Sequence, residues 1–86
     1  MKVSVDLTLT PLSDEYEHSI KTFIKKIRSS GFKVIENPLS TQIYGEYDSL
    51  MSSLQEIIRE TFEEESFVIL NLKIVKGDRS KYVPSF

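Results

Sequence analysis

Few side chains in this sequence are of the types that carry out covalent chemistry. Cysteine is absent, which excludes disulfide frameworks, thiolate nucleophiles and cysteine-based metal sites. The single histidine, His18, falls near the first turn of a predicted helix, where we expect it to face solvent without metal-binding carboxylates around it. Carboxylates such as Glu63–Glu65 stand in runs that are typical of a solvated helix surface. We therefore predict no catalytic residues, no metal and no cofactor.

The stretch PLSTQIYG at residues 38–45 holds polar groups that are better placed for binding. Read as a strand, it puts Leu39, Thr41, Ile43 and Gly45 on one face and Ser40, Gln42 and Tyr44 on the other. If the first face lies in the core, the hydroxyl of Thr41 sits among apolar neighbours. It either bonds a local backbone carbonyl or, with Ser40 and the loop at residues 11–14, supplies the polar groups of an apolar pocket. The residues alone leave both interpretations open.

The first half of the chain predicts a strand followed by an amphipathic helix. Residues 1–10 alternate strictly and place Val3, Val5, Leu7 and Leu9 on one face. Pro11 ends this strand, and Ser13 or Asp14 then offers an oxygen that could cap a helix. The apolar stripe of that helix is predicted to be Tyr16, Ile20, Phe23, Ile24 and Ile27, and Gly31 is a natural stop.

The second half predicts two strands, a helix and a last strand. Residues 32–36 form the second strand, Asn37-Pro38 signals a turn, and the third strand follows. A helix begins near Asp48 or Ser49, with an apolar face of Leu50, Leu54, Ile57, Ile58, Thr61 and Phe62. Residues 67–75 alternate again, with Val68, Leu70, Leu72 and Ile74 against Phe67, Ile69, Asn71 and Lys73. The tail, about residues 77–86, carries Tyr82, Val83 and Phe86 and is expected to pack on something.

The order strand, helix, strand, strand, helix, strand predicts an α+β fold, the ferredoxin-like βαββαβ sandwich. It has a four-stranded antiparallel sheet with two helices on one face. Eighty-six residues suffice for a single domain, 1–86, and not for two. The second face of the sheet is left open, and Tyr44, Phe67 and Ile69 would be exposed on it together. We expect a homodimer through this open face, with dimer and tetramer both left open, rather than a simply solvated face.

Composition excludes several other classes of function. A formal net charge of −2 argues against a nucleic-acid surface, and the basic cluster around Lys25, Lys26 and Arg28 is more typical of a solvated helix. The three glycines are too widely spaced for a phosphate-binding loop. No apolar run approaches the ~20 residues of a membrane span, and the start of the chain does not follow a signal-peptide pattern. We expect no membrane partner and a cytoplasmic location.

Three motifs add a family resemblance to these patterns. They are LTPLSDEY at residues 9–16, LSTQIYG at 39–45 and VILNLKIVKGD at 68–78. They resemble the first helix entry, the Ser-Thr-x-Ile-x-Gly strand and the last strand of the YkoF-like thiamine- and hydroxymethylpyrimidine-binding proteins and of the related single-domain thiamine-binding family. The resemblance implies a ferredoxin-like fold, domains paired through their sheets and no catalytic activity. It also implies a pocket for thiamine or its pyrimidine half, in vitamin uptake or salvage.

The resemblance further implies roles for individual residues. Ser40 and Thr41 would hydrogen-bond the pyrimidine, while Asp14 would close the loop side of the pocket or cap the helix. Tyr16 would be a pocket wall or a core aromatic, and Asn71 a polar group on the last strand. Because Ser40 and Thr41 point opposite ways along a strand, some of these residues would instead serve the sheet interface or a pocket shared between subunits.

Two functions are therefore in competition. The first is a non-enzymatic binding protein for thiamine or hydroxymethylpyrimidine. The second is an oligomeric structural or regulatory interaction module without a small ligand. Tyr44 bears on the choice, because single-domain relatives often carry a glutamate before the strand-ending glycine where this chain has a tyrosine. Tyr44 would either fill the dimer face or change what is bound.

Overall fold

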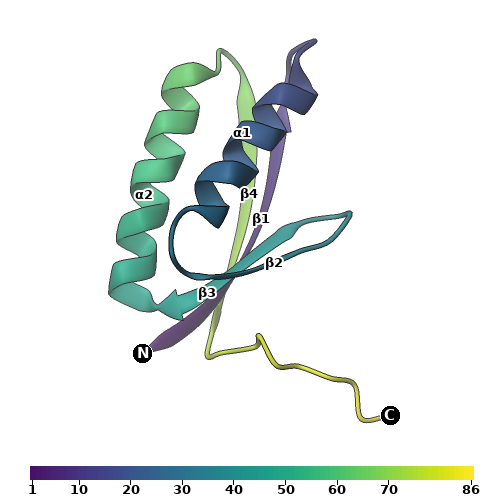
Figure 1. Cartoon of the computed structure of the whole chain (residues 1–86), viewed down its shortest axis with the longest axis vertical. Helices are drawn as coiled ribbons and strands as arrows, with labels where there is room; N and C mark the ends of the chain where they lie inside the picture. Colours follow the sequence, from purple (N-terminus) through teal and green to yellow (C-terminus); the bar gives the residue numbers. More distant parts are fainter.

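The computed structural model describes residues 1–86 and has the predicted ferredoxin-like topology. The elements are β1 (Lys2–Pro11), α1 (Tyr16–Arg28), β2 (Lys33–Glu36), β3 (Thr41–Glu46), α2 (Tyr47–Glu64) and β4 (Val68–Lys76). The strands form one antiparallel sheet in the order β2-β3-β1-β4, and both helices lie on the same face of it (Figure 1). The α+β, βαββαβ architecture is confirmed. None of the helices is both long enough and apolar enough to cross a membrane.

The core lies between the two helices and the central strands. Alternation along β1 buries Val3, Val5, Leu7 and Leu9, as predicted. The remaining core residues are Phe23 and Ile27 of α1, Ile43 of β3, and Leu50, Leu54 and Ile57 of α2. Because burying one such side chain is worth about 1.5–3 kcal/mol, this cluster is the main source of stability that holds the helices on the sheet.

The helices differ from expectation at their outer ends. Neither Ser13 nor Asp14 caps α1: the capping position is Glu15, and no side chain bonds the free N–H groups. This end of the helix is exposed, so water can satisfy those groups. Tyr16 is half exposed and stands outside the core, and Phe62 at the far end of α2 is half exposed as well. Tyr16 is the first residue of α1, and Phe62 lies two residues before the end of α2.

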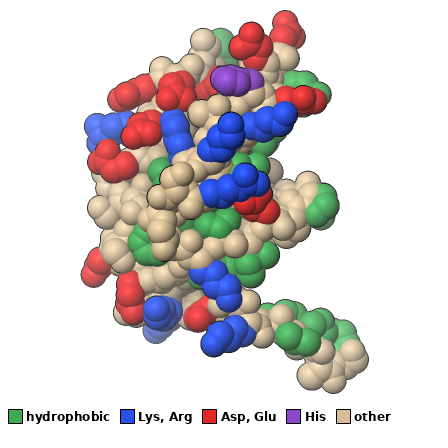
Figure 2. All heavy atoms as spheres, in the orientation of Figure 1, with side chains coloured by type: hydrophobic (Ala, Val, Ile, Leu, Met, Phe, Trp, Pro, Cys, Tyr) green, Lys and Arg blue, Asp and Glu red, His purple; other side chains and the backbone are tan.

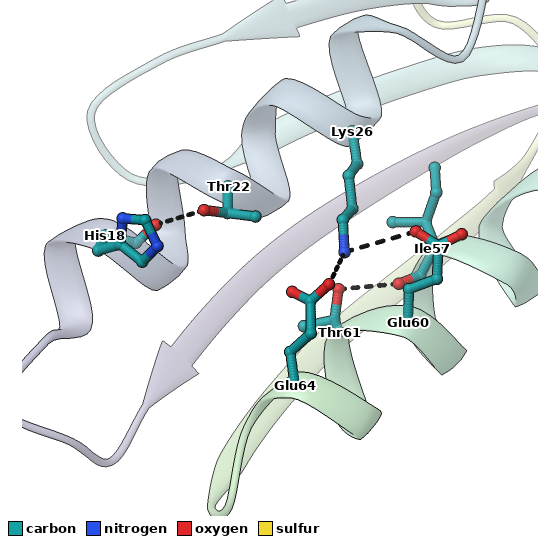
Figure 3. Close-up of polar contacts among 7 residues, drawn as sticks. All are labelled: His18, Thr22, Lys26, Ile57, Glu60, Thr61 and Glu64. Carbon is teal, nitrogen blue, oxygen red and sulfur yellow. Dashed lines mark hydrogen bonds and ion pairs between the residues drawn. The ribbon is translucent and has the colours of Figure 1, made fainter.

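Ion pairs join α1 to α2 and to β2. The ammonium of Lys26 lies 3.4 Å from a carboxylate oxygen of Glu60 and 3.0 Å from one of Glu64 (Figure 3). Burial lowers the pKa of Lys26, but the hydrogen bonds and attraction of Glu64 and Glu60 outweigh it and the pKa is raised. Arg28 donates two hydrogen bonds to Glu36. The basic side chains gathered over α1 in Figure 2 are thus partly neutralised by local acids.

The turn of the β2–β3 hairpin is longer than expected, and both strands are shorter. β2 begins at Lys33, and Phe32 precedes it. β3 begins at Thr41, so Leu39, which the alternation places on the core face of the strand, lies in the turn and is 85% exposed. The cause is Asn37, whose side-chain oxygen accepts hydrogen bonds from the backbone N–H groups of Leu39 and Ser40, both at 3.0 Å.

The expectation that the tail packs on something is wrong within this chain, except at its base. The hydroxyl of Ser4 donates to the carbonyl of Gly77 and accepts from the N–H of Arg79, both at 2.8 Å. This contact buries Ser4 on the otherwise open face of the sheet. Beyond it the tail runs away from the body (Figure 1), and three of its side chains are at least 70% exposed: Tyr82, Val83 and Phe86.

Candidate functional site

A cavity of about 200 Å³ opens on the helix side of the sheet. It lies beside Leu7 of β1 and its register partner Thr41, the first residue of β3. Three segments line the cavity: Leu7–Leu9 of β1, one side of α1, and the hairpin residues Asn37–Thr41. The α1 residues in the wall are Ile20, Phe23 and Ile24. Most of the wall is therefore apolar, and the hairpin contributes most of the polar groups.

Thr41 differs from every other buried polar side chain in the protein. Four polar residues are buried, and three of them make hydrogen bonds: Ser4 to Gly77, Ser19 to the Glu15 carbonyl at 3.3 Å, and Thr61 to the Ile57 carbonyl at 2.8 Å. Thr41 is the fourth. It is 6% exposed, and its hydroxyl has no hydrogen-bond partner.

The hydroxyl of Thr41 does not bond a local backbone carbonyl, which was one of the two interpretations left open by the sequence. No side-chain oxygen or nitrogen is fully enclosed without a partner, so the Thr41 oxygen keeps some accessible surface. Since Thr41 lines the cavity, we assign that surface to the cavity wall. An unbonded hydroxyl in an apolar wall is a position where a ligand could form a hydrogen bond without displacing a protein group.

The hairpin that carries Thr41 is held in place by its own side chains. Asn37 fixes the turn through its side-chain oxygen, and its N–H donates to the carbonyl of Ser40 at 3.1 Å. Thr8 of β1 donates to the carbonyl of Leu39 at 3.5 Å. These bonds set the outer wall of the cavity, and Leu39 stands exposed at its mouth.

Ser40 belongs to a polar network on the opposite face of the sheet, although it also borders the cavity. The side-chain N–H₂ of Gln42 donates to the Ser40 hydroxyl at 2.7 Å and to a carboxylate oxygen of Asp6 at 3.0 Å. The hydrogen bond from Gln42, the Ser40 hydroxyl and the charge of Lys73 lower the pKa of Asp6, against the opposite effect of burial. Asp6 is thus held as a carboxylate.

The other residues suggested by the family resemblance are not in the cavity. Tyr44 and Asn71 lie on the open face, where they pair in register with Ser4 and Thr8 of β1. Burial, reinforced by the negative charges of Asp6 and Asp78, raises the pKa of Tyr44, so its phenol stays neutral. Asp14 and Tyr16 are exposed at the start of α1. The structure therefore brings only Thr41 and Ser40 of the six to the cavity wall.

Comparison with known proteins identifies the family of this chain. Residues 5–82 match the model of a family described as thiamine-binding protein. The chain belongs to the thiamine-binding protein family. No curated protein matches the sequence.

Solved structures agree with membership of the thiamine-binding protein family. A candidate thiamine biosynthesis or salvage protein of Thermotoga maritima is 28% identical, with a TM-score of 0.78 over 86% of this chain and 82% of its own. A protein of Streptococcus pneumoniae is 29% identical, with a TM-score of 0.83 over 91% and 89%. A domain of unknown function from Bacillus cereus shares the fold at 19% identity, with a TM-score of 0.73 over 99% and 79%.

In this member of the thiamine-binding protein family, Gly45 does not leave room for a ligand. A Cβ atom built on Gly45 would stand 2.6 Å from Cδ1 of Phe32, so the ring of Phe32 occupies that space. The sequence assigned Phe32 to a strand and gave no sign of this contact. The sequence pattern likewise predicts only a turn at Asn37, and only core positions for Ile20 and Ile24 of α1. The helical spacing of those two residues could have placed them beside β1, but not around a cavity.

Proposed function

We propose that this protein is a non-enzymatic binder of thiamine that holds the pyrimidine half, in vitamin uptake or salvage. The observation that carries the proposal is the buried, unbonded hydroxyl of Thr41 in the wall of an apolar cavity. An aminopyrimidine offers both donors and acceptors to such a hydroxyl, and its flat ring suits a wall containing Phe23. Membership of the thiamine-binding protein family supports this ligand class.

The size of the cavity favours one ring over two. Pockets for whole drug-sized ligands usually measure about 300–1,000 Å³. The cavity beside Thr41 measures about 200 Å³ and is therefore suited to the hydroxymethylpyrimidine ring alone. In thiamine the second ring, a cationic thiazolium, would then lie outside the mouth.

The start of α1 is where we place the thiazolium. Tyr16 precedes the cavity residue Ile20 by one helical turn and so lies on the same side of α1. Its half-exposed ring could stack on a cation, and the carboxylate of Asp14 nearby in the chain would add attraction. This assignment gives both residues a role outside the pyrimidine pocket.

The open face of the sheet is proposed to join two copies of the chain. It exposes Phe67 and Ile69, at 72% and 50%, beside the network of Asp6, Gln42 and Ser40. Apolar side chains beside satisfied polar groups are the usual composition of a subunit interface. Tyr44 and Asn71 lie on this face, so we assign them to the dimer contact rather than to the pocket.

Ligand binding is tested by thermal unfolding in the presence of thiamine, hydroxymethylpyrimidine and the free thiazole. At 100 times the dissociation constant a ligand stabilises its protein by ~2.7 kcal/mol. For a protein of this size that is a rise of roughly 10 °C or more. We expect thiamine and hydroxymethylpyrimidine to raise the melting temperature and the thiazole to leave it unchanged. No rise with either pyrimidine compound at millimolar concentration would refute the proposal and favour the interaction module.

The matched variants are Thr41→Val and Thr61→Val. Both threonines are at least 94% buried and both changes replace a hydroxyl with a methyl group, but Thr61 is on α2 and outside the cavity. Thr41→Val should weaken hydroxymethylpyrimidine binding about tenfold, because a hydrogen bond of ~1.4 kcal/mol is lost. Thr61→Val should leave the affinity unchanged. Equal affinities of the two variants would remove Thr41 from the site.

A further inference from the structure

Strand β1 runs past the end of its neighbour β3. Its pairing with β3 ends where Leu7 stands opposite Thr41, whereas its pairing with β4 continues to the last residue of the strand. By the same register Leu9 should pair with Leu39. Leu39 lies in the turn instead, and its N–H bonds the side chain of Asn37 at 3.0 Å. The edge of β1 at Leu9 therefore has no strand beside it.

Two bonds at the start of β1 fix the direction of its backbone groups. On the β4 side, Gly77 N–H donates to the carbonyl of Lys2 at 2.8 Å. On the β3 side, Tyr47 N–H donates to the carbonyl of Met1 at 2.8 Å. Because this direction alternates along an antiparallel strand, the even-numbered residues of β1 bond β4 and the odd-numbered residues bond β3. The N–H and C=O of Leu9 thus point beyond the first residue of β3, and no backbone bond from the turn reaches them.

Leu9 is nevertheless buried, at 8% exposed, and it lines the same cavity as Thr41. Buried backbone groups without a partner are rare, because they lose their hydration and gain no bond in return. The turn residues that would otherwise cover this edge line the cavity as well: Pro38, Leu39 and Ser40. The unpaired groups of Leu9 therefore face the cavity, where water can satisfy them in the absence of a ligand.

The chemistry of these groups indicates which part of a ligand they bind. One donor and one acceptor on the same residue suit a ligand edge that presents an acceptor beside a donor. An aminopyrimidine has such an edge, since a ring nitrogen accepts and the neighbouring amino group donates. No charged side chain lines the cavity, so uncharged hydrogen-bonding groups have to select the ligand.

We propose that the main-chain N–H and C=O of Leu9 recognise the amino edge of the pyrimidine, in the place that a paired strand residue would occupy. The inference rests on the proposed function, because it names the contact that selects the ring in the same cavity. Thr41 then binds another part of the ligand. A contact made by the backbone of a central strand is held rigidly, and it survives substitution of the side chains around it.

This contact predicts how the protein ranks three pyrimidines. Replacing the amino group of hydroxymethylpyrimidine with hydrogen removes the donor to the Leu9 carbonyl, so the deamino analogue should bind about tenfold more weakly. Replacing it with an oxo group turns the donor into an acceptor and the neighbouring ring nitrogen into a donor. Both positions then oppose like groups on Leu9, and the oxo analogue should bind about 100-fold more weakly.

The first test is calorimetric titration of the wild type and of Thr41→Val with hydroxymethylpyrimidine and its deamino analogue. If Leu9 reads the amino edge, Thr41→Val weakens both ligands alike and the tenfold preference for the amino group stays. A preference that disappears in Thr41→Val, or that is absent from the wild type, would overturn the proposal and leave the proposed function standing. No binding of hydroxymethylpyrimidine to the wild type would refute the proposed function and this contact with it.

The second test is a synthetic chain with an ester in place of the backbone amide at Leu9, which keeps the side chain and removes the N–H. The matched control is the same exchange at Leu7, whose N–H points toward Thr41 of β3. Each ester also weakens the carbonyl of the preceding residue, which in both cases faces β4.

In the absence of ligand, the Leu7 ester should lower the urea midpoint more than the Leu9 ester, because only the N–H of Leu7 has a partner in the protein. The Leu9 ester should bind hydroxymethylpyrimidine about tenfold more weakly than the wild type. Equal midpoints for the two esters would mean that the N–H of Leu9 is bonded within the protein. That result, or an unchanged affinity of the Leu9 ester, would overturn the proposal.

Discussion

Thr41 and Gly45 lie four residues apart on the helix side of β3, and the space above them is used in opposite ways. Above Gly45 the protein inserts its own aromatic ring, Phe32, and no room is left. Beside Thr41 the walls of α1, β1 and the hairpin stand apart around a cavity. The same strand therefore has a closed end and an open end.

Of the two ends, only the one at Thr41 has room for a ligand. At the closed end the absent side chain of Gly45 has a complete explanation in packing. At the open end the buried hydroxyl of Thr41 has no partner in the protein, although every other buried polar side chain has one. Packing alone explains the first position, whereas the second leaves a hydroxyl available to a ligand in the cavity wall.

The largest expected effect on stability is at the closed end. Gly45→Ala places a methyl group 2.6 Å from the Phe32 ring, and overpacking of this kind costs about 1–3 kcal/mol. Urea unfolding measures the change.

The control for this prediction is the same substitution in a Phe32→Leu background. There the clash is relieved, so Gly45→Ala should cost much less and the two changes should be strongly non-additive. Additive costs would mean that the ring of Phe32 is not what excludes a side chain at Gly45.

An intermediate effect separates Thr41 from Thr61 in the absence of ligand. Thr61→Val removes a buried hydrogen bond of 2.8 Å and should cost about 1 kcal/mol. Thr41→Val removes no hydrogen bond and should change the free energy of unfolding by less than about 0.5 kcal/mol. If Thr41→Val is the more destabilising of the two in urea, the Thr41 hydroxyl has a structural partner. It would then no longer support a ligand site at the open end of β3.

The smallest effect concerns the polar network behind the hairpin. The pKa of Asp6 is lowered in the folded protein, chiefly by Gln42. Its contribution to stability is therefore complete above the unfolded value of about 3.9 and is lost as the pH falls through the lower folded value. Below about pH 4 the wild type should lose stability more steeply than Asp6→Asn. Parallel curves of urea midpoint against pH would remove Asp6 from the network.

Local pattern was enough to predict most of the fold. Strict alternation identified β1 and its buried face, and the spacing of Phe23 and Ile27 identified the core side of α1. The errors occurred where a side-chain hydrogen bond or the place of a strand in the sheet overrides the alternating pattern. Leu39 fitted the alternation of β3, but the side chain of Asn37 turns the chain there. Leu72 and Ile74 alternated correctly, yet the end position of β4 leaves them partly exposed.

The sequence by itself determined the order of elements, their buried faces and the position of the Thr41 hydroxyl among apolar neighbours, because these depend on spacing along the chain. Only the tertiary structure decided that Thr41 has no hydrogen-bond partner, that Gly45 makes room for Phe32 and that one sheet edge is open. These depend on which segments meet in space: α1 with the hairpin, Phe32 with β3, and β4 with nothing beyond it.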